Sequence, residues 1–213
     1  MDICNLMRLS DANKDRIRIA DDFCDFAIQI RKELLNFPEW IPMTQISADG
    51  SASVLNYNGQ TGITTGHLGE EQHADNLSFC YQFHEFIFHY KKQICDLFQV
   101  PYHQETHVET NAMAYGNGGW FSGHTDTVKE YGRQFERCIS WILYLTPPEH
   151  GEWSESEGGG LKLRHPEGID EVIYPKFNRL VVFKVENMWH EVTPVETTMW
   201  ETCRLSLSGW IKC

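Results

Sequence analysis

Two side chains that could share a metal ion stand close together in the middle of this chain. In the tetrapeptide Gly123-His124-Thr125-Asp126, the histidine and the aspartate are two positions apart. On an extended strand their side chains point to the same side and can converge on one point. A third ligand from another strand would complete a face of two histidines and one carboxylate, which leaves positions open on a divalent iron for substrate and oxygen. We predict that His190 is this third ligand.

A second tripeptide of the same form, His73-Ala74-Asp75, has a different context. It runs directly into an apolar helical segment, so we interpret Asp75 or Asn76 as a helix N-cap. Three further histidines form His-x-Glu tripeptides, namely His107, His150 and His165, and two lie on the second predicted helix, namely His84 and His89. We expect surface or structural roles for all five.

The last apolar segment carries a guanidinium at the head of an alternating pattern, in which Arg204 and Ser206 are interleaved with Leu205 and Leu207. If the polar face is turned into a barrel, an unpaired buried arginine costs several kcal/mol, so it should meet an anion there. Arginine grips a carboxylate through two parallel hydrogen bonds, and Ser206 can donate a third. The opposite orientation, with the leucines inside and the polar face in solvent, fits an isolated strand equally well.

The first part of the chain is predicted to be helical. From residue 10 or 11 onward the apolar residues recur at steps of three and four, which predicts an amphipathic helix that Pro38 ends. Residues 40–43 should be extended. A second helix is predicted over residues 79–97, with Pro101 as its stop.

After Pro101 the apolar period changes to two, and turn residues separate short runs. This pattern predicts a sandwich or jelly-roll barrel, with the preceding helices as a buttress on one sheet. The expected strands are residues 105–115, 120–127, 138–145, 160–164, 171–174, 179–185, 189–194 and 203–212.

Two loops are candidates for substrate contact. Residues 47–76 are rich in Gly, Ser, Thr and Asn, with one strand-like patch at 53–57. A loop of this length is often a lid or binding loop, although a mobile surface hairpin fits as well. The acidic loop within 146–158 either contacts substrate or is a solvated run of charge.

The composition limits the class of protein. At 213 residues and 41% hydrophobic content the chain suits one domain over 1–213, with helical support and a lid loop in 1–103 and the barrel core in 104–213. The net charge of -12 argues against nucleic-acid binding, which depends on clustered Lys and Arg. The seven scattered cysteines show no Cys-x-x-Cys, and no signal peptide or membrane span is evident, so we expect a cytoplasmic protein. The oligomeric state stays open, with Trp200, Trp210 and Cys213 as candidates for an interface.

The combined pattern is specific. His124-x-Asp126, then His190, then Arg204 in an Arg-x-Ser sequence resembles the iron(II)- and 2-oxoglutarate-dependent dioxygenases, and within them the prolyl hydroxylase-type branch. The resemblance spans roughly residues 104–213. It is carried by NAMAYGNGGWFSGHTD (111–126), ISWILYLTP (139–147), EGGGLKL (157–163), PKFNRLVVFKVENMWHEVTPV (175–195) and RLSLSGW (204–210).

The resemblance implies a double-stranded β-helix of the jelly-roll, cupin-like kind. It implies that His124, Asp126 and His190 hold catalytic iron(II), and that the cosubstrate 2-oxoglutarate is bound by Arg204, Tyr144, Ser206 and Tyr115. The implied reaction uses O2, with ascorbate as a candidate reductant, and releases succinate and CO2. It hydroxylates an unactivated carbon of a prolyl or other amino-acid-like substrate, which is a peptide or protein residue, a free amino acid or a small natural product.

Two other classes of function were weighed against the hydroxylase. A cupin-like metal-dependent isomerase or lyase would use the same three metal ligands but would not need Arg204 with Tyr144. A non-catalytic binding module predicts no iron binding. One departure from the family pattern concerns the substrate, because residues 191–203, between the distal histidine and the arginine, form a longer stretch than in the animal oxygen-sensing prolyl hydroxylases.

Overall fold

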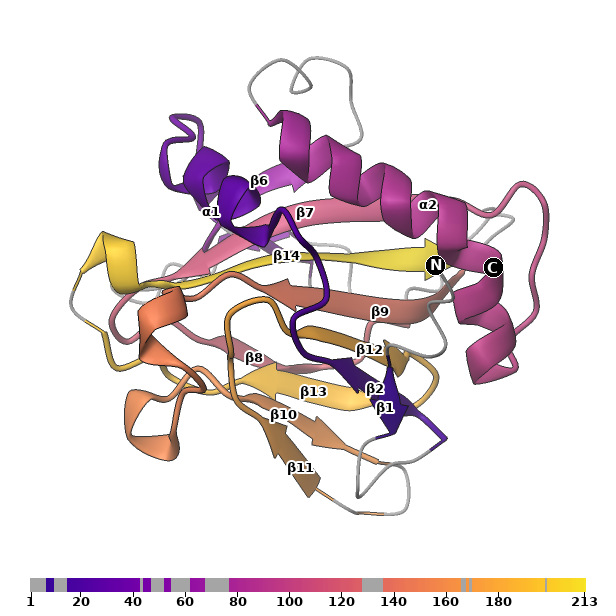
Figure 1. Cartoon of the computed structure of the whole chain (residues 1–213). Helices are drawn as coiled ribbons and strands as arrows, with labels where there is room; N and C mark the ends of the chain where they lie inside the picture. The colour runs from indigo at the N-terminus through magenta and orange to yellow at the C-terminus, as the bar shows by residue number, and fades with distance from the viewer. Residues whose placement is uncertain are drawn as a thin grey trace.

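The computed structural model describes residues 7–9, 15–42, 44–46, 52–54, 62–67, 77–127, 136–165, 168, 170–197 and 199–213. Two antiparallel sheets face each other, and two helices cover the outer side of the larger one (Figure 1). The larger sheet has the strand order β1 (Arg8–Leu9), β2 (Ile17–Ala20), β12 (Leu180–Lys184), β9 (Arg137–Tyr144), β14 (Arg204–Lys212), β7 (Val108–Tyr115), β6 (Ile63–His67) and β3 (Ile41–Pro42).

The smaller sheet has the order β11 (Asp170–Ile173), β10 (Leu161–Arg164), β13 (Trp189–Val192) and β8 (Phe121–His124). A separate two-stranded ribbon joins β4 (Thr44–Ile46) to β5 (Ala52–Val54). The helices are α1 (Ala27–Leu35) and α2 (Ser78–Phe98), and three short 3-10 helices are η3 (Pro148–His150), η4 (Glu155–Glu157) and η5 (Trp200–Thr202). Neither α1 nor α2 is both long and apolar enough to cross a membrane.

Side chains of the larger sheet alternate between two cores. In β9, Trp141 and Leu143 belong to the core under the helices, whereas Tyr144 belongs to the core between the sheets. In β12, Val182 and Phe183 divide in the same way. Successive residues of a strand point to opposite faces, so a sheet that is covered on both sides buries both sets. The predicted double-stranded β-helix with a helical buttress is therefore confirmed.

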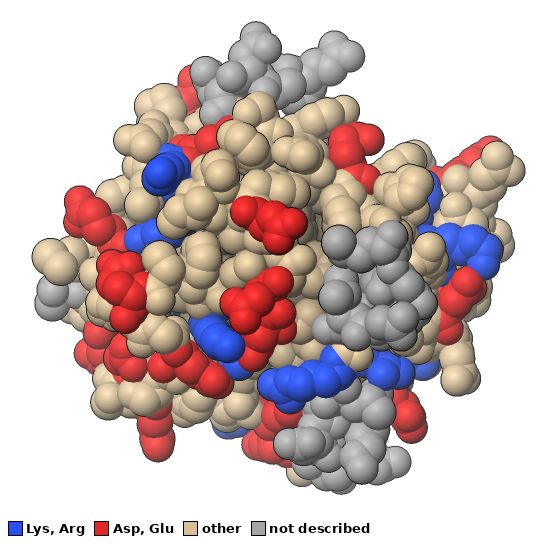
Figure 2. Space-filling model, in the orientation of Figure 1, with Lys and Arg blue, Asp and Glu red and all other residues tan. Residues whose placement is uncertain are grey.

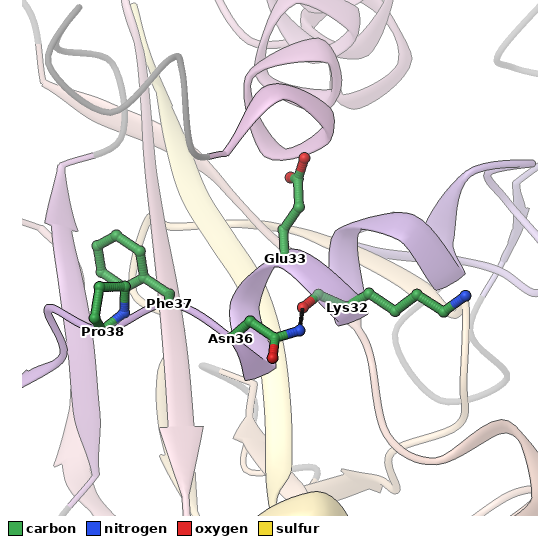
Figure 3. Close-up of a pocket in the computed structure, with 5 residues that line it drawn as sticks. All are labelled: Lys32, Glu33, Asn36, Phe37 and Pro38. Atoms are coloured by element: carbon green, nitrogen blue, oxygen red, sulfur yellow. Dashed lines mark hydrogen bonds between the residues drawn. The ribbon is translucent and has the colours of Figure 1, made fainter.

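The two helices are joined at the start of α2. The Glu33 carboxylate in α1 accepts hydrogen bonds from the backbone N–H groups of Phe79 and Cys80, at 3.0 and 3.1 Å, and from the Ser78 hydroxyl. A helix N-terminus has free N–H donors and a positive dipole end, so a carboxylate stabilises it. Figure 3 shows Glu33 directed toward α2 beside a surface hollow that is lined by Lys32, Glu33, Asn36, Phe37 and Pro38. This hollow contains none of the predicted site residues.

The prediction of a helix from residue 10 or 11 to Pro38 is wrong for the first part of that segment. Ile17–Ala20 forms strand β2, which pairs with β12, and the helix is limited to Ala27–Leu35. Ile17 and Ile19 are buried between the sheets, and Asp22 has φ +53, which interrupts any regular helix. The apolar spacing is compatible with either structure, and the free edge of β12 decides in favour of the strand.

All eight strands that were predicted after Pro101 are present, and the second predicted helix corresponds to α2. Within the predicted loop 47–76, however, Ile63–His67 forms β6 and pairs with β7. The proposed cap at Asp75 or Asn76, together with His73, lies outside the described residues.

Candidate metal centre and cosubstrate pocket

The three predicted metal ligands meet at one end of the smaller sheet. His124 ends β8 and pairs across the sheet with His190 of β13, and Asp126 follows two residues after His124. The His124 Nε2 atom lies 3.3 Å from Asp126 Oδ1, and the His190 Nε2 atom lies 3.5 Å from Asp126 Oδ2. One ligand atom from each residue lies within 4.8 Å of the others. The three side chains therefore converge as a metal site requires.

Both imidazoles are oriented by the backbone. The Nδ1 atom of His124 lies 2.8 Å from the Ser122 carbonyl oxygen, and that of His190 lies 3.3 Å from the Met188 carbonyl oxygen. A carbonyl only accepts hydrogen bonds, so we assign the proton of each ring to Nδ1. The lone pair of each Nε2 is then free to bind a metal, which is the usual arrangement for histidine ligands.

Burial and the neighbouring groups together set the protonation of Asp126 and His190. Burial alone would raise the pKa of Asp126, but His190, His124 and the Trp210 indole together hold the pKa of this carboxyl well below its usual range. Burial also lowers the pKa of His190, despite the nearby carboxylate. An ionised carboxylate and neutral imidazoles are the forms that bind a divalent cation. The donor set therefore fits iron(II) and would leave it a net charge near +1.

A network of partly buried side chains extends from the carboxylate of Asp126. The Trp210 Nε1–H group donates to Asp126 Oδ2 at 2.7 Å. The Arg137 guanidinium lies 3.6 Å from the centre of the Trp210 ring and forms an ion pair with Glu109 at 2.8 Å. Lys212 pairs with the other oxygen of Glu109. The sequence left Trp210 as a candidate for an interface, although it alternates in register with Arg204 on one strand face, and that alternation was the signal that its side chain faces the barrel.

At the other end of the barrel, Arg204 is almost completely buried, with 1% of its surface exposed. Its Nε–H donates to the Gly159 carbonyl oxygen at 2.6 Å, and an Nη2–H donates to the Tyr144 hydroxyl at 3.3 Å. Its guanidinium carbon lies 5.2 and 5.0 Å from the ring centres of Tyr115 and Tyr144. Among the described residues, these hydrogen bonds and ring contacts connect the cation only to neutral groups.

A buried cation with only neutral partners calls for an anion, because a desolvated charge is costly when it is left unpaired. Burial raises the pKa of Tyr115 to about 12 and also raises that of Tyr144, so neither phenol supplies the negative charge. The residues around Arg204 therefore fit a carboxylate ligand such as one end of 2-oxoglutarate.

The part of β14 between Arg204 and Trp210 is polar on the face that points into the barrel. Ser206 and Ser208 are buried on the same face of β14 as Arg204, and the Ser208 hydroxyl has no hydrogen-bond partner in the described part of the chain. Tyr115 contacts only the Met113 sulfur through its hydroxyl, at 3.7 Å. Ser206 and Tyr115 thus lie near the pocket as predicted, but Tyr144 is the tyrosine that contacts Arg204 by a hydrogen bond.

The second predicted substrate loop is largely structural. Trp153 is buried among Tyr115, Val192 and Val195, and Glu152 forms an ion pair with Arg179 at 2.7 Å. Trp153 thus packs the loop against the end of the barrel beside Arg204, whereas residues 148–152 and 154–156 are exposed to solvent.

Comparison with known proteins agrees with this geometry. Residues 110–212 match the family model of the 2OG-Fe(II) oxygenase superfamily. No curated protein sequence matches the chain. A prolyl-4-hydroxylase of Pseudomonas putida is similar in structure, with a TM-score of 0.64, 20% identity, and coverage of 92% of this chain and 92% of that chain.

A prolyl hydroxylase of Trichoplax adhaerens, in complex with a hypoxia inducible factor peptide fragment, has a TM-score of 0.68 and 16% identity, and the match covers 98% of this chain and 88% of that chain. A viral collagen prolyl hydroxylase of Paramecium bursaria Chlorella virus 1 has a TM-score of 0.55 and 16% identity, with coverage of 96% and 99%. At these identities the similarity establishes a shared fold. The match to the 2OG-Fe(II) oxygenase superfamily covers residues 110–212, and together with the His-Asp-His site it supports an enzyme that uses iron(II) and 2-oxoglutarate.

Proposed function

We propose that this enzyme hydroxylates an unactivated carbon of a prolyl or other amino-acid-like substrate. In this proposal His124, Asp126 and His190 hold the iron, and Arg204 with Tyr144 anchors 2-oxoglutarate. The observation that carries the proposal is the buried Arg204, whose partners among the described residues are neutral and which lies in the same barrel as the convergent metal ligands. A cupin-like isomerase or lyase would need the metal ligands but not this cation.

The roles of the residues follow from their contacts. When bound, iron(II) and 2-oxoglutarate supply an oxygen-activating redox centre that couples the formation of succinate and CO2 to hydroxylation of a C–H bond. Arg204 donates to the oxygen of Tyr144, which leaves the phenolic O–H of Tyr144 free to donate to a carboxylate. The guanidinium and the phenol can thus bind the same anion, and Ser206 lies beside them.

Two aromatic side chains pack against the strands that carry the histidine ligands. The Phe183 ring packs edge-on against His190, with ring centres 5.1 Å apart. Gly123 lies directly under Trp189, where a Cβ atom would be 1.7 Å from Trp189 Cζ2. This packing holds β8 and β13, the strands that carry His124 and His190, against each other.

Two observations bear on the class of substrate. The structurally similar enzyme of Trichoplax adhaerens is in complex with a peptide, which supports a peptide or protein substrate here. Acidic side chains are spread over much of the surface seen in Figure 2, in keeping with the net charge of -12, and such a surface favours a neutral or basic substrate. We propose that residues 47–76 select the substrate, and exchange of that loop should change the substrate preference.

The first experiment needs no substrate. Iron(II) and then 2-oxoglutarate are added to the apo-protein without oxygen, and the weak visible charge-transfer band of the chelated cosubstrate is recorded. We expect the band in the wild type, no band in His124→Ala, and a much higher half-saturating 2-oxoglutarate concentration in Arg204→Lys. Arg164→Lys is the matched control, because Arg164 is exposed and its contacts are with Asp170 and the ring of Trp189, not with the pocket of Arg204.

The second experiment identifies the reaction. Succinate release is measured with proline-containing peptides, free proline and other amino acids, and products are examined by mass spectrometry for one added oxygen atom. Substrate-dependent succinate with a hydroxylated product supports the proposal. Iron binding without the 2-oxoglutarate band, together with unchanged activity in Arg204→Lys, would favour the cupin-like alternative instead.

A further inference from the structure

Three cysteine thiols gather at the end of the sheet that lies under α2. Cys95 belongs to α2, Cys138 to β9, and Cys213 directly follows β14. The Sγ atoms of Cys95 and Cys213 are 3.8 Å apart although the residues are 118 positions apart in the chain. Cys138 and Cys213 both pack against the helix-side core to which Cys95 belongs. Only the folded structure brings the three together.

The backbone holds Cys213 in this position. Its N–H donates to the Glu136 carbonyl oxygen at 2.9 Å, and its own carbonyl oxygen accepts from the Glu136 N–H at 3.2 Å. This reciprocal pair extends the contact between β14 and β9 to the last residue, and it places the Cys213 side chain between the helix and Cys138. The thiol is therefore fixed in place by the sheet.

The thiols differ in exposure. Cys95 is completely buried, whereas Cys138 and Cys213 are partly exposed. A hydrogen bond from Cys213 lowers the pKa of the Cys95 thiol, although burial opposes this effect. The same contacts raise the pKa of the Cys213 thiol, so the buried Cys95 is the more readily ionised sulfur of the pair, and Cys213 is the sulfur that an external disulfide can reach.

Cysteine also packs as a small apolar residue, and that role alone would explain a buried thiol. It does not require a second sulfur in contact with the first. The remaining buried cysteines, Cys24, Cys80 and Cys203, show no sulfur–sulfur contact in the described part of the chain.

We propose that Cys95 and Cys213 form a reversible redox modification site that takes a small-molecule disulfide of the glutathione class as its oxidant. The partly exposed Cys213 sulfur loses its proton and attacks one sulfur of glutathione disulfide, which forms a mixed disulfide and releases one glutathione thiolate. The Cys95 thiolate then attacks Cys213 Sγ, which forms the Cys95–Cys213 bond and releases the second glutathione. The two cysteine protons pass to the two glutathione thiolates, so two protein thiols are oxidised and one glutathione disulfide is reduced.

The bond would tie α2 to the strand that carries Arg204 and Trp210. It would close a loop of more than a hundred residues, and a cross-link of that length strongly restricts the unfolded chain. We therefore expect the melting temperature of the full-length protein to rise by about 5 °C or more after oxidation and to return after reduction.

The test treats the reduced, full-length protein with a titrated glutathione disulfide buffer, followed by alkylation of free thiols and peptide mass spectrometry. We expect a peptide that links Cys95 to Cys213, and the rise in melting temperature should follow its formation. Cys213→Ser should abolish both effects. Cys24→Ser is the matched control and should abolish neither, because Cys24 lies elsewhere in the same core.

Three outcomes would overturn the proposal. The first is glutathionylation of Cys213 without an internal disulfide. The second is a linked peptide between Cys138 and Cys213, which would assign the site to a different pair. The third is a Cys95–Cys213 bond that forms in the denatured protein but not in the folded protein. Cys95→Ala provides a second variant, since the loss of one buried methyl-sized sulfur is tolerated better there than a buried hydroxyl.

Discussion

Replacement of Trp210 by phenylalanine tests whether the network behind the metal ligands matters for iron binding. The indole N–H donates to Asp126 Oδ2 at 2.7 Å, and phenylalanine removes that donor while it keeps an aromatic ring for Arg137 to stack on. The ion pair between Arg137 and Glu109 does not involve the indole nitrogen. The change therefore removes one hydrogen bond from the carboxylate and leaves most of the surrounding packing in place.

The expected effect follows from the charge and burial of Asp126. Only 4% of this residue is exposed, so water cannot replace the lost donor well. A hydrogen bond to a charged group contributes about 1.5–3 kcal/mol, which is roughly a 10- to 100-fold change in an equilibrium constant. Partners that orient metal ligands have effects of about the same size on metal affinity. We expect iron(II) to bind about 10- to 100-fold more weakly to Trp210→Phe.

The measurement is an anaerobic iron(II) titration of wild type and variant by calorimetry, with the melting temperature of each apo-protein as a check on folding. Trp200→Phe is the matched control, because its indole N–H donates to the carbonyl oxygen of Leu35, the last residue of α1, and not to a metal ligand. The control should bind iron as the wild type does. An iron affinity of Trp210→Phe within twofold of the wild type, with the fold intact, would refute the argument that this hydrogen bond positions Asp126.

Three further predictions concern other parts of the molecule. Gly123→Ala places a methyl group 1.7 Å from Trp189 Cζ2, so we expect about 1–3 kcal/mol of destabilisation and weaker iron binding, measured by urea unfolding and iron titration; unchanged values would show that Trp189 can move away. Arg204→Lys keeps the charge but loses the planar fork, and the KM for 2-oxoglutarate should rise about 10- to 100-fold with a smaller change in kcat. Hydrogen bonds and charge from Arg179 lower the pKa of Asp21 from 3.8 to about 2 against the opposing effect of its partial burial. Its stabilisation is thus complete above pH ~4 and is lost as the pH falls through about 2. Asp21→Asn should therefore cost about 1–2 kcal/mol at pH 7, after allowance for solvent screening, with the difference from wild type shrinking below pH 4 in urea unfolding; a difference that is independent of pH would contradict this assignment.

The sequence predicted most of the strands, but not all of them. The alternation of apolar and polar residues after Pro101 is a local property of a strand, which is why all eight strands were predicted. The same rule failed for Ile17–Ala20, where apolar residues suit a helix or a strand and the choice depends on pairing with β12. β6 (Ile63–His67) was missed because its strand character depends on pairing with β7.

The sequence by itself indicated the donor types of the metal centre, because two imidazoles and one carboxylate are the ligand set that suits iron(II). Strand β8 ends at His124, so the fold, and not strand alternation, places Asp126 beside it. The sequence could not determine which face of β14 points into the barrel, since both Arg204 and Leu205 are buried. Arg204 lies in the barrel and Leu205 lies under the helices. Nor could the sequence assign Trp210 to Asp126, or Cys95 to Cys213. Those contacts join residues far apart in the chain, and only the packing of two sheets and a helix brings them within bonding distance.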